Sequence, residues 1–106
     1  MNDEVTMEWL MDDTIQSDSG VSLAKMTLAV GATSECHSHS NCTETIHLIS
    51  GTVEQLCGDK WIHLEAGDTC LIPQNYVHKS RNIGDKSAIM MLAYSSGSRV
   101  YEVCDY

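Results

Sequence analysis

The chain has 106 residues, of which 15 are acidic and 6 are basic, so its formal net charge is −9 at pH 7. This length allows one domain with one hydrophobic core, and a hydrophobic content of 42% excludes wholesale disorder. An acidic chain without a cluster of lysine and arginine repels polyanions, so nucleic acids and anionic membranes are excluded as partners.

The first 20 residues form an acidic segment that precedes the expected single domain over residues 21–106. Two interpretations stay open for this segment: a solvated leader, as is common at chain termini, or an edge strand over Val5–Met11 that adds to a sheet of this or of a partner subunit. The segment lacks the basic and apolar regions of a secretory signal, so we expect a cytoplasmic protein. No apolar run approaches the ~20 residues needed to span a bilayer.

From residue 21 onward, short β-rich runs alternate with turn residues, and helical periodicity is absent. Turn signals such as Ser50-Gly51 and Gly58-Asp59 separate the runs. This pattern predicts an all-β sandwich or barrel. The expected strands are Val21–Val30, Glu35–His39, Thr45–Ser50, Thr52–Cys57, Trp61–Leu64, Thr69–Ile72, His78–Asn82, Ala88–Tyr94 and Arg99–Val103.

A group of metal-binding residue types stands out in the middle of the chain. His37 and His39 lie two residues apart, which on a strand places both rings on one face, roughly 6.5–7 Å apart. Glu44 follows after a polar loop, and His78 follows the turn that begins at Pro73. The sequence therefore predicts one metal site built from these two histidines, Glu44 and His78.

The stretches around these residues resemble the paired motifs of the cupin superfamily. The two motifs are G-x5-H-x-H-x4-E-x6-G and G-x5-P-x-G-x2-H-x3-N, and 15 residues separate them here. The only departure is Asn75, where the family usually has glycine, and asparagine tolerates the positive φ of such a turn. The matching residues are Gly31, His37, His39, Glu44, Gly51, Gly67, Pro73, His78 and Asn82.

The resemblance implies a double-stranded β-helix, also called a jelly-roll or cupin barrel, with the metal inside one open end. It assigns the ligand roles to His37, His39, Glu44 and His78. Imidazole and carboxylate donors suit Fe, Mn, Ni, Zn or Cu, so one divalent transition metal ion is the expected cofactor. We expect the second ring nitrogen of each histidine to donate a hydrogen bond that fixes the ring.

The resemblance also implies a function, a metal-dependent enzyme that acts on a small anionic organic substrate. Dioxygenase chemistry is our first choice, and lyase, decarboxylase and isomerase chemistries use the same family site. The alternative is a non-catalytic module that binds or senses a small molecule through the metal. Tyr76 is a candidate catalytic residue because it lies two residues before His78. Lys79 and Arg81 alternate away from His78, so we expect no basic side chain in the pocket.

The five cysteines are odd in number, irregularly spaced and without a CxxC pair. This pattern favours free thiols in a reducing compartment. By alternation Cys36 should point away from the metal, whereas Cys42 lies in the loop between His39 and Glu44. Because short barrels leave exposed edges and apolar outer faces, we also expect a homodimer.

Overall fold

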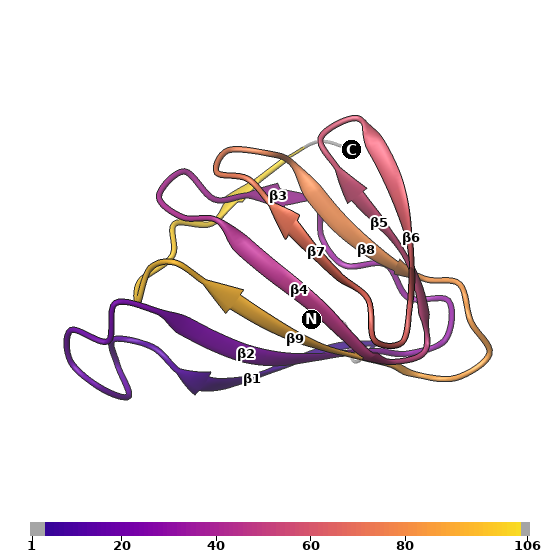
Figure 1. Ribbon diagram of the computed structural model, residues 1–106, viewed down its shortest axis with the longest axis horizontal. Helices are drawn as coiled ribbons and strands as arrows, with labels where there is room; N and C mark the ends of the chain where they lie inside the picture. The colour runs from indigo at the N-terminus through magenta and orange to yellow at the C-terminus, as the bar shows by residue number, and fades with distance from the viewer. Residues whose placement is uncertain (1–3, 105–106) are drawn as a thin grey trace.

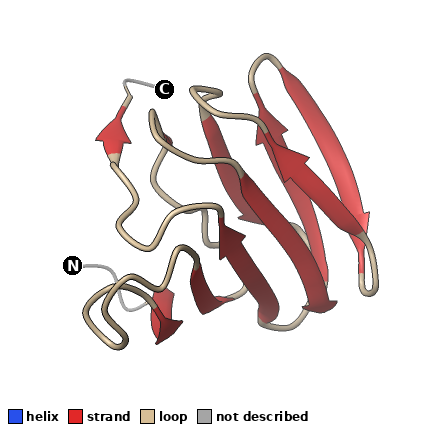
Figure 2. Cartoon of the chain, turned by 60° about the vertical axis from the view of Figure 1, so that its left-hand side comes forward, coloured by secondary structure: helices blue, strands red, loops and turns tan. Residues whose placement is uncertain are grey.

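The computed structural model describes residues 4–104, and within them ten strands form two five-stranded antiparallel sheets (Figure 1). One sheet has the order β1-β2-β9-β4-β7 and the other β10-β3-β8-β5-β6. The described residues contain strands and loops but no helix (Figure 2). The strands are β1 (Val5–Met11), β2 (Ser22–Leu28), β3 (His37–Ser38), β4 (Glu44–Ser50), β5 (Thr52–Cys57), β6 (Lys60–Glu65), β7 (Thr69–Ile72), β8 (His78–Asn82), β9 (Ala88–Tyr94) and β10 (Glu102–Val103).

This architecture confirms the expected all-β double-stranded β-helix. Crossovers between the sheets place strands distant in sequence side by side, so that β2 pairs with β9 and β4 pairs with both β7 and β9. Within residues 4–104, the structure shows no helix with the length and apolar character needed to cross a membrane.

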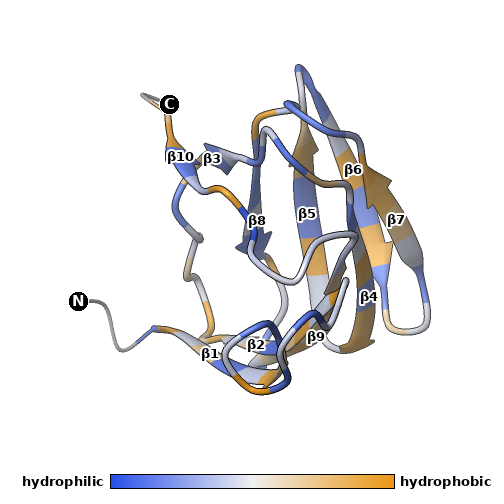
Figure 3. Cartoon of the chain, turned by 90° about the vertical axis from the view of Figure 1, so that its left-hand side faces the viewer, coloured by the Kyte–Doolittle hydropathy of each residue, from blue (hydrophilic) through white to orange (hydrophobic). Residues whose placement is uncertain are grey.

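Strand alternation builds the core between the two sheets. In β2 every second side chain is fully buried, and β4 and β9 repeat the pattern over most of their length. Polar and apolar bands alternate along β4 and β5 in Figure 3. Because successive strand residues point to opposite faces, the inward set forms one core. Its fully buried members include Leu28, Ile46, Leu48, Val53, Ile72 and Met90.

Within the acidic N-terminal segment, Val5–Met11 is the edge strand of this chain's own sheet. It pairs with β2 from Val5 opposite Leu28 to Trp9 opposite Ala24, and Val5 and Trp9 pack against the core. Of the two interpretations, the edge strand is therefore correct for residues 5–11. These residues form a strand because their inward side chains pack against the apolar core. Residues 1–3 and 105–106 lie outside the described residues.

Two strands are shorter than the sequence pattern predicts. β3 covers only His37–Ser38 of the expected Glu35–His39, and β10 covers only Glu102–Val103 of the expected Arg99–Val103. The β3–β8 ladder contains a single pair, His37 opposite His78. Residues beside these short strands are free of regular pairing and can contribute side chains and carbonyls to the site described below.

The motif residues that are not metal-ligand candidates shape the backbone. Asn75 has φ 72°, which confirms that asparagine supplies the positive φ expected at this turn. The buried Asn82 side chain donates hydrogen bonds to the carbonyls of Leu28, Ala29 and Lys86 and accepts one from the Gly84 amide. These hydrogen bonds of the Asn82 side chain link the end of β2 to the turn that follows β8.

Gly51 should tolerate no other residue, and Gly67 provides a matched control. Their φ values are nearly equal, 99° and 98°, but a Cβ on Gly51 would lie 2.9 Å from the Ala88 Cα, whereas one on Gly67 meets nothing within 4 Å. We expect Gly67→Ala to lower the free energy of unfolding by roughly 1–2 kcal/mol through backbone strain. Gly51→Ala should lower it distinctly further. Urea denaturation measures both, and equal losses would contradict the close approach at Ala88.

Candidate metal centre

Four candidate ligands meet at one end of the space between the two sheets. His37 begins β3 and His78 begins β8, and these two residues are direct partners across the sheet. His39 follows β3, and Glu44 begins β4 in the opposite sheet. One potential ligand atom from each of the four lies within 4.8 Å of all the others. The fold therefore brings together the same four side chains that the sequence predicts as metal ligands.

Backbone carbonyls fix the orientation of all three imidazole rings. The Nδ1 atoms of His37, His39 and His78 lie 2.7, 2.7 and 3.0 Å from the carbonyl oxygens of Glu35, Val100 and Tyr76, respectively. A carbonyl oxygen can only accept, so each Nδ1 must carry the proton and donate. This confirms the expected hydrogen bonds on the second ring nitrogen, and it leaves Nε2 of each neutral ring as an unprotonated donor to a metal.

The Glu44 carboxylate lies directly against two of these Nε2 atoms. Its Oε1 is 2.9 Å from His78 Nε2 and 3.2 Å from His39 Nε2, and all three side chains are 2–3% exposed. Burial alone would raise the pKa of Glu44, but the contacts with His39 and His78 lower it below its usual value, so the group is ionised. Burial, the largest cause, and the neighbouring His78 lower the pKa of His37 to about 4, so its ring is neutral near pH 7.

This arrangement fits a metal ion because it needs a positive charge. With each Nδ1 committed to a carbonyl, neutral rings at His39 and His78 would direct nitrogen lone pairs at a carboxylate oxygen, which is repulsive. Either protons or a cation must lie between them. Three imidazole nitrogens and one carboxylate are a donor set that a divalent transition metal favours. The residues present therefore fit the ion that the sequence motifs imply.

The site opens into a cavity of about 560 Å³ with an apolar wall. Met26, Ile46 and Leu92 line it beside His37, Glu44 and His78, and the Tyr94 side chain reaches it from the end of β9. Burial, and then the Glu44 charge, raise the pKa of Tyr94, so its hydroxyl stays protonated. A volume of this size suits a small organic ligand.

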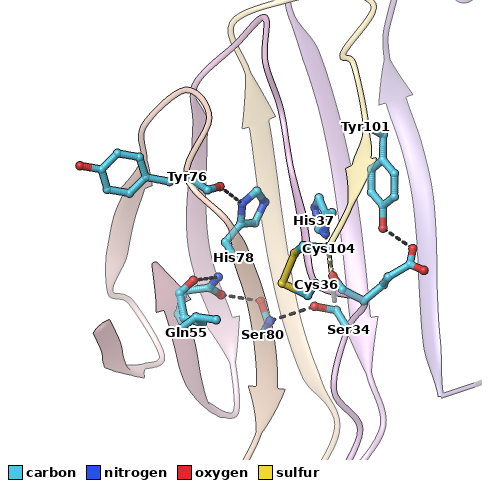
Figure 4. The surroundings of a disulfide bond; sticks show 11 residues. Ser34, Cys36, His37, Gln55, Tyr76, His78, Ser80, Tyr101 and Cys104 are labelled. Atoms are coloured by element: carbon cyan, nitrogen blue, oxygen red, sulfur yellow. Dashed lines mark hydrogen bonds between the residues drawn. A yellow bond between two sulfur atoms is a disulfide. The ribbon is translucent and has the colours of Figure 1, made fainter. Parts of the chain in front are cut away.

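Tyr76, the candidate catalytic residue, is not placed at this cavity. Its side chain is 48% exposed, points away from the histidines (Figure 4), and packs over Gly58. Only its backbone participates, because its carbonyl accepts from His78 Nδ1. Among residues 4–104, the tyrosines that line the cavity are Tyr94 and Tyr101.

The expectation that no basic side chain enters the pocket is wrong. Lys79 and Arg81 do face outward, where both lie over the Trp61 ring. Arg99, however, lines the cavity from the loop after β9. Alternation along β8 could not reveal it, because Arg99 lies in an irregular segment after the last motif. The only feature of the sequence that could have drawn attention to Arg99 is that basic residues are few in this acidic chain.

The C-terminal segment 99–104 is part of the metal centre. The Val100 carbonyl holds His39, and the Tyr101 ring is stacked on the His37 ring with centroids 4.4 Å apart. The Tyr101 hydroxyl donates to the Glu35 carboxylate at 2.6 Å (Figure 4). β10 then pairs with β3, with Val103 opposite His37. This segment thus supports both histidines of the H-x-H motif from outside.

A disulfide between Cys36 and Cys104 fastens this segment to the residue before His37 (Figure 4). The expectation that all five cysteines are free thiols is therefore wrong for this pair. β10 brings their Cα atoms to 5.5 Å although they lie 68 residues apart in sequence, a distance suited to a disulfide. The pairing removes the argument for a reducing compartment. The free cysteines are Cys42, Cys57 and Cys70.

The remaining side chains flagged along the chain lie outside the ligand set. Cys42 is buried in the core cluster, and burial raises its pKa. His47 is exposed and hydrogen-bonded to Thr69, and His63 is exposed beside Glu65. None of these three residues lines the cavity.

Comparison with known proteins identifies the family and supports the fold. The family described as "Cupin domain" matches residues 24–94. Germin-like protein 3-8 of Oryza sativa subsp. japonica is 32% identical over 82 residues, which are 73% of this chain and 36% of the relative. The chain thus spans less than half the length of the germin-like relative it matches.

Solved structures support the same fold. Recombinant oxalate oxidase in complex with glycolate superimposes with a TM-score of 0.85 at 22% identity, covering 97% of this chain and 56% of that one. A structure of oxalate decarboxylase gives a TM-score of 0.88 at 21% identity, covering 97% of this chain and 29% of that one. At these identities the likeness establishes the shared double-stranded β-helix.

Loss of the disulfide should weaken metal binding. In Cys104→Ser the segment that holds His39 and His37 is free to separate from β3, and outer supports of this kind typically account for 10–100-fold in metal affinity. We expect a loss of about tenfold in zinc affinity, measured by competition with a chromophoric chelator. A phosphine reductant should lower the affinity of the wild type similarly and leave that of Cys104→Ser unchanged. Equal affinities in all four samples would contradict this role.

The metal-free protein should lose stability in acid through His37. The pKa of this ring is about 4 in the folded chain and ~6.5 when unfolded, so below pH 6.5 the unfolded state binds more protons. The contribution of His37 to the free energy of unfolding should be constant above pH 6.5. It should fall by roughly 1–3 kcal/mol between pH 6.5 and 4. Urea denaturation of chelator-treated His37→Gln should lack this fall, whereas His47→Gln should keep it. If the free energies of unfolding of His37→Gln and the wild type fall equally between pH 6.5 and 4, the assignment of this acid sensitivity to His37 is wrong.

Proposed function

The chain belongs to the cupin domain family, and from the site it carries we propose that it is a metal-dependent enzyme acting on a small carboxylate. The observation that carries the proposal is the largely buried cluster of three oriented imidazoles and Glu44 beside a cavity with an apolar wall. Oxygen-dependent oxidation of the dioxygenase type is our first choice of reaction, and decarboxylation is the alternative. Fe and Mn are the metals that suit the oxygen-dependent reaction best, and Ni, Cu or Zn also suit the donor set.

The roles of the chain's own residues follow from their positions. His37, His39, His78 and Glu44 would hold the metal, and the carbonyls of Glu35, Val100 and Tyr76 keep the rings in place. A divalent metal bound there supplies Lewis acidity and, for redox-active ions, reactivity with oxygen. Tyr94 keeps its proton and can donate a hydrogen bond from its hydroxyl to a substrate oxygen.

The substrate class is supported by size and charge. A cavity of about 560 Å³ admits a small molecule but no polymer. The ligand set carries one negative charge, so a divalent ion leaves the centre near +1 and attracts an anion. The superimposed oxalate oxidase was solved in complex with glycolate, and oxalate decarboxylase has the same fold. Both names point toward small carboxylates.

Metal analysis and turnover together test this function. We expect close to one equivalent of transition metal per chain in gently purified protein, and little in the double variant His37→Ala/His39→Ala. His47→Ala removes an exposed histidine with no place in the cluster, so it should keep the metal. Equal metal content in the double variant and the wild type would contradict the site.

Turnover is then measured on Fe-, Mn- and Zn-loaded protein with oxalate and glycolate. Oxygen consumption reports oxidation, and carbon dioxide release without oxygen consumption reports decarboxylation. We expect oxygen consumption with the Fe or Mn form and none with the Zn form. Tight binding without either reaction across small carboxylates would instead favour a module that only binds or senses its ligand.

A further inference from the structure

Arg99 is the basic residue of the cavity, and its surroundings are unusual. Its guanidinium carbon lies 4.8 Å from the Trp9 ring, 5.2 Å from the Tyr94 ring and 4.8 Å from the Tyr101 ring. These three rings come from β1, from the end of β9 and from the C-terminal segment. Three parts of the fold therefore converge to hold one cation beside the metal centre.

Within residues 4–104, no carboxylate forms an ion pair with Arg99, and no hydrogen bond from its guanidinium is present. This is unexpected in a chain with 15 acidic residues. The attraction between a cation and a ring face is not a hydrogen bond to an acceptor, so the N–H groups of the guanidinium stay available to an acceptor. The cage thus holds the cation without using its hydrogen-bonding capacity.

The two carboxylates in the cavity are engaged elsewhere. Glu44 contacts His39 and His78, and Glu35 accepts the hydrogen bond from the Tyr101 hydroxyl. The planar guanidinium of an arginine can donate two parallel hydrogen bonds, one to each oxygen of a carboxylate. The N–H groups of Arg99 are available for such a pair. A ligand carboxylate is therefore the acceptor that suits it.

We propose that Arg99 is the specificity-determining residue of this site and binds the carboxylate of a small hydroxy acid, oxo acid or dicarboxylate. The inference rests on the proposed function for the second anchor, a ligand oxygen at the metal. Tyr94 also lines the cavity, with its ring 5.2 Å from the Arg99 guanidinium carbon, and its hydroxyl can donate to the same ligand. Neutral molecules of equal size lack the charge that Arg99 recognises and bind weakly.

The test compares glycolate with glycolamide, which has nearly the same size but no charge. Binding to zinc-loaded protein is measured by calorimetry, so that no turnover enters the result. Arg99→Gln should weaken glycolate binding by about tenfold to a hundredfold, the range for losing a charge-assisted pair, and should leave glycolamide binding unchanged. The matched control, Arg81→Gln, removes the arginine stacked on Trp61 outside the cavity and should change neither.

Further readouts separate recognition from structure. Arg99→Lys keeps the charge but not the planar fork, so its affinity for glycolate should lie between those of the wild type and Arg99→Gln. It also decides the question if Arg99→Gln fails to fold. In a Trp61→Phe background Trp9 is the remaining tryptophan, and glycolate, unlike glycolamide, should change its fluorescence. Zinc content should be equal in all Arg99 variants, because Arg99 is not a ligand.

The outcomes distinguish this inference from the proposed function. If folded, zinc-loaded Arg99→Gln or Arg99→Lys binds glycolate as tightly as the wild type, the inference is overturned whatever the enzyme's reaction. It is also overturned if Arg99→Gln weakens glycolamide binding as much as glycolate binding, since the effect is then on cavity shape. If the wild type binds glycolate through Arg99 but no metal form turns over any carboxylate, the proposed enzyme function fails and the role of Arg99 stands.

Discussion

Three backbone carbonyls determine the chemistry of this protein. By accepting from Nδ1 of His37, His39 and His78, they fix the tautomer of each ring, and the Nε2 atoms of His39 and His78 lie against the ionised, buried Glu44. An ionised group buried away from water must find an opposite charge nearby. The two sheets supply the geometry but not the charge, so protons or a bound cation must supply it at this point. The same hydrogen bonds that orient the rings therefore also make the cluster a suitable site for a metal ion.

The C-terminal segment shows that this centre extends beyond the cupin motifs. One short stretch provides the carbonyl on His39, the ring stacked on His37, the disulfide partner of Cys36 and the arginine of the cavity. These contacts couple the anchoring of residues 99–104 to two proposed properties, metal affinity and recognition of anions, which could otherwise vary independently. A change that releases β10 from β3 affects all three together.

The four ligands could be predicted because their spacing reports local geometry. His37 and His39 share a strand face, and the glycine, proline and asparagine positions of the motifs mark turns whose positive φ the structure contains at Gly31, Gly51, Gly67 and Asn75. The support from the C-terminal segment could not be predicted, because Val100 and Cys104 meet their partners across 61 and 68 residues of sequence. No periodicity reports such a contact. The position of the Tyr76 side chain outside the cavity could not be predicted for a related reason, because closeness in sequence to His78 does not place a side chain in the cavity.

The charge distribution is compatible with the proposed binding of a small anion by an acidic protein. The net charge of −9 repels anions at a distance, but at physiological ionic strength exposed charges are screened beyond about 8 Å. Inside an apolar cavity screening is much weaker, so a divalent ion in the His/Glu cluster and the caged Arg99 dominate the local field. A small carboxylate that enters the cavity passes from a weakly repulsive exterior to a strongly attractive interior. A polyanion too large to enter meets only the acidic exterior, so the proposed attraction of a small anion is compatible with the repulsion of polyanions expected from the net charge.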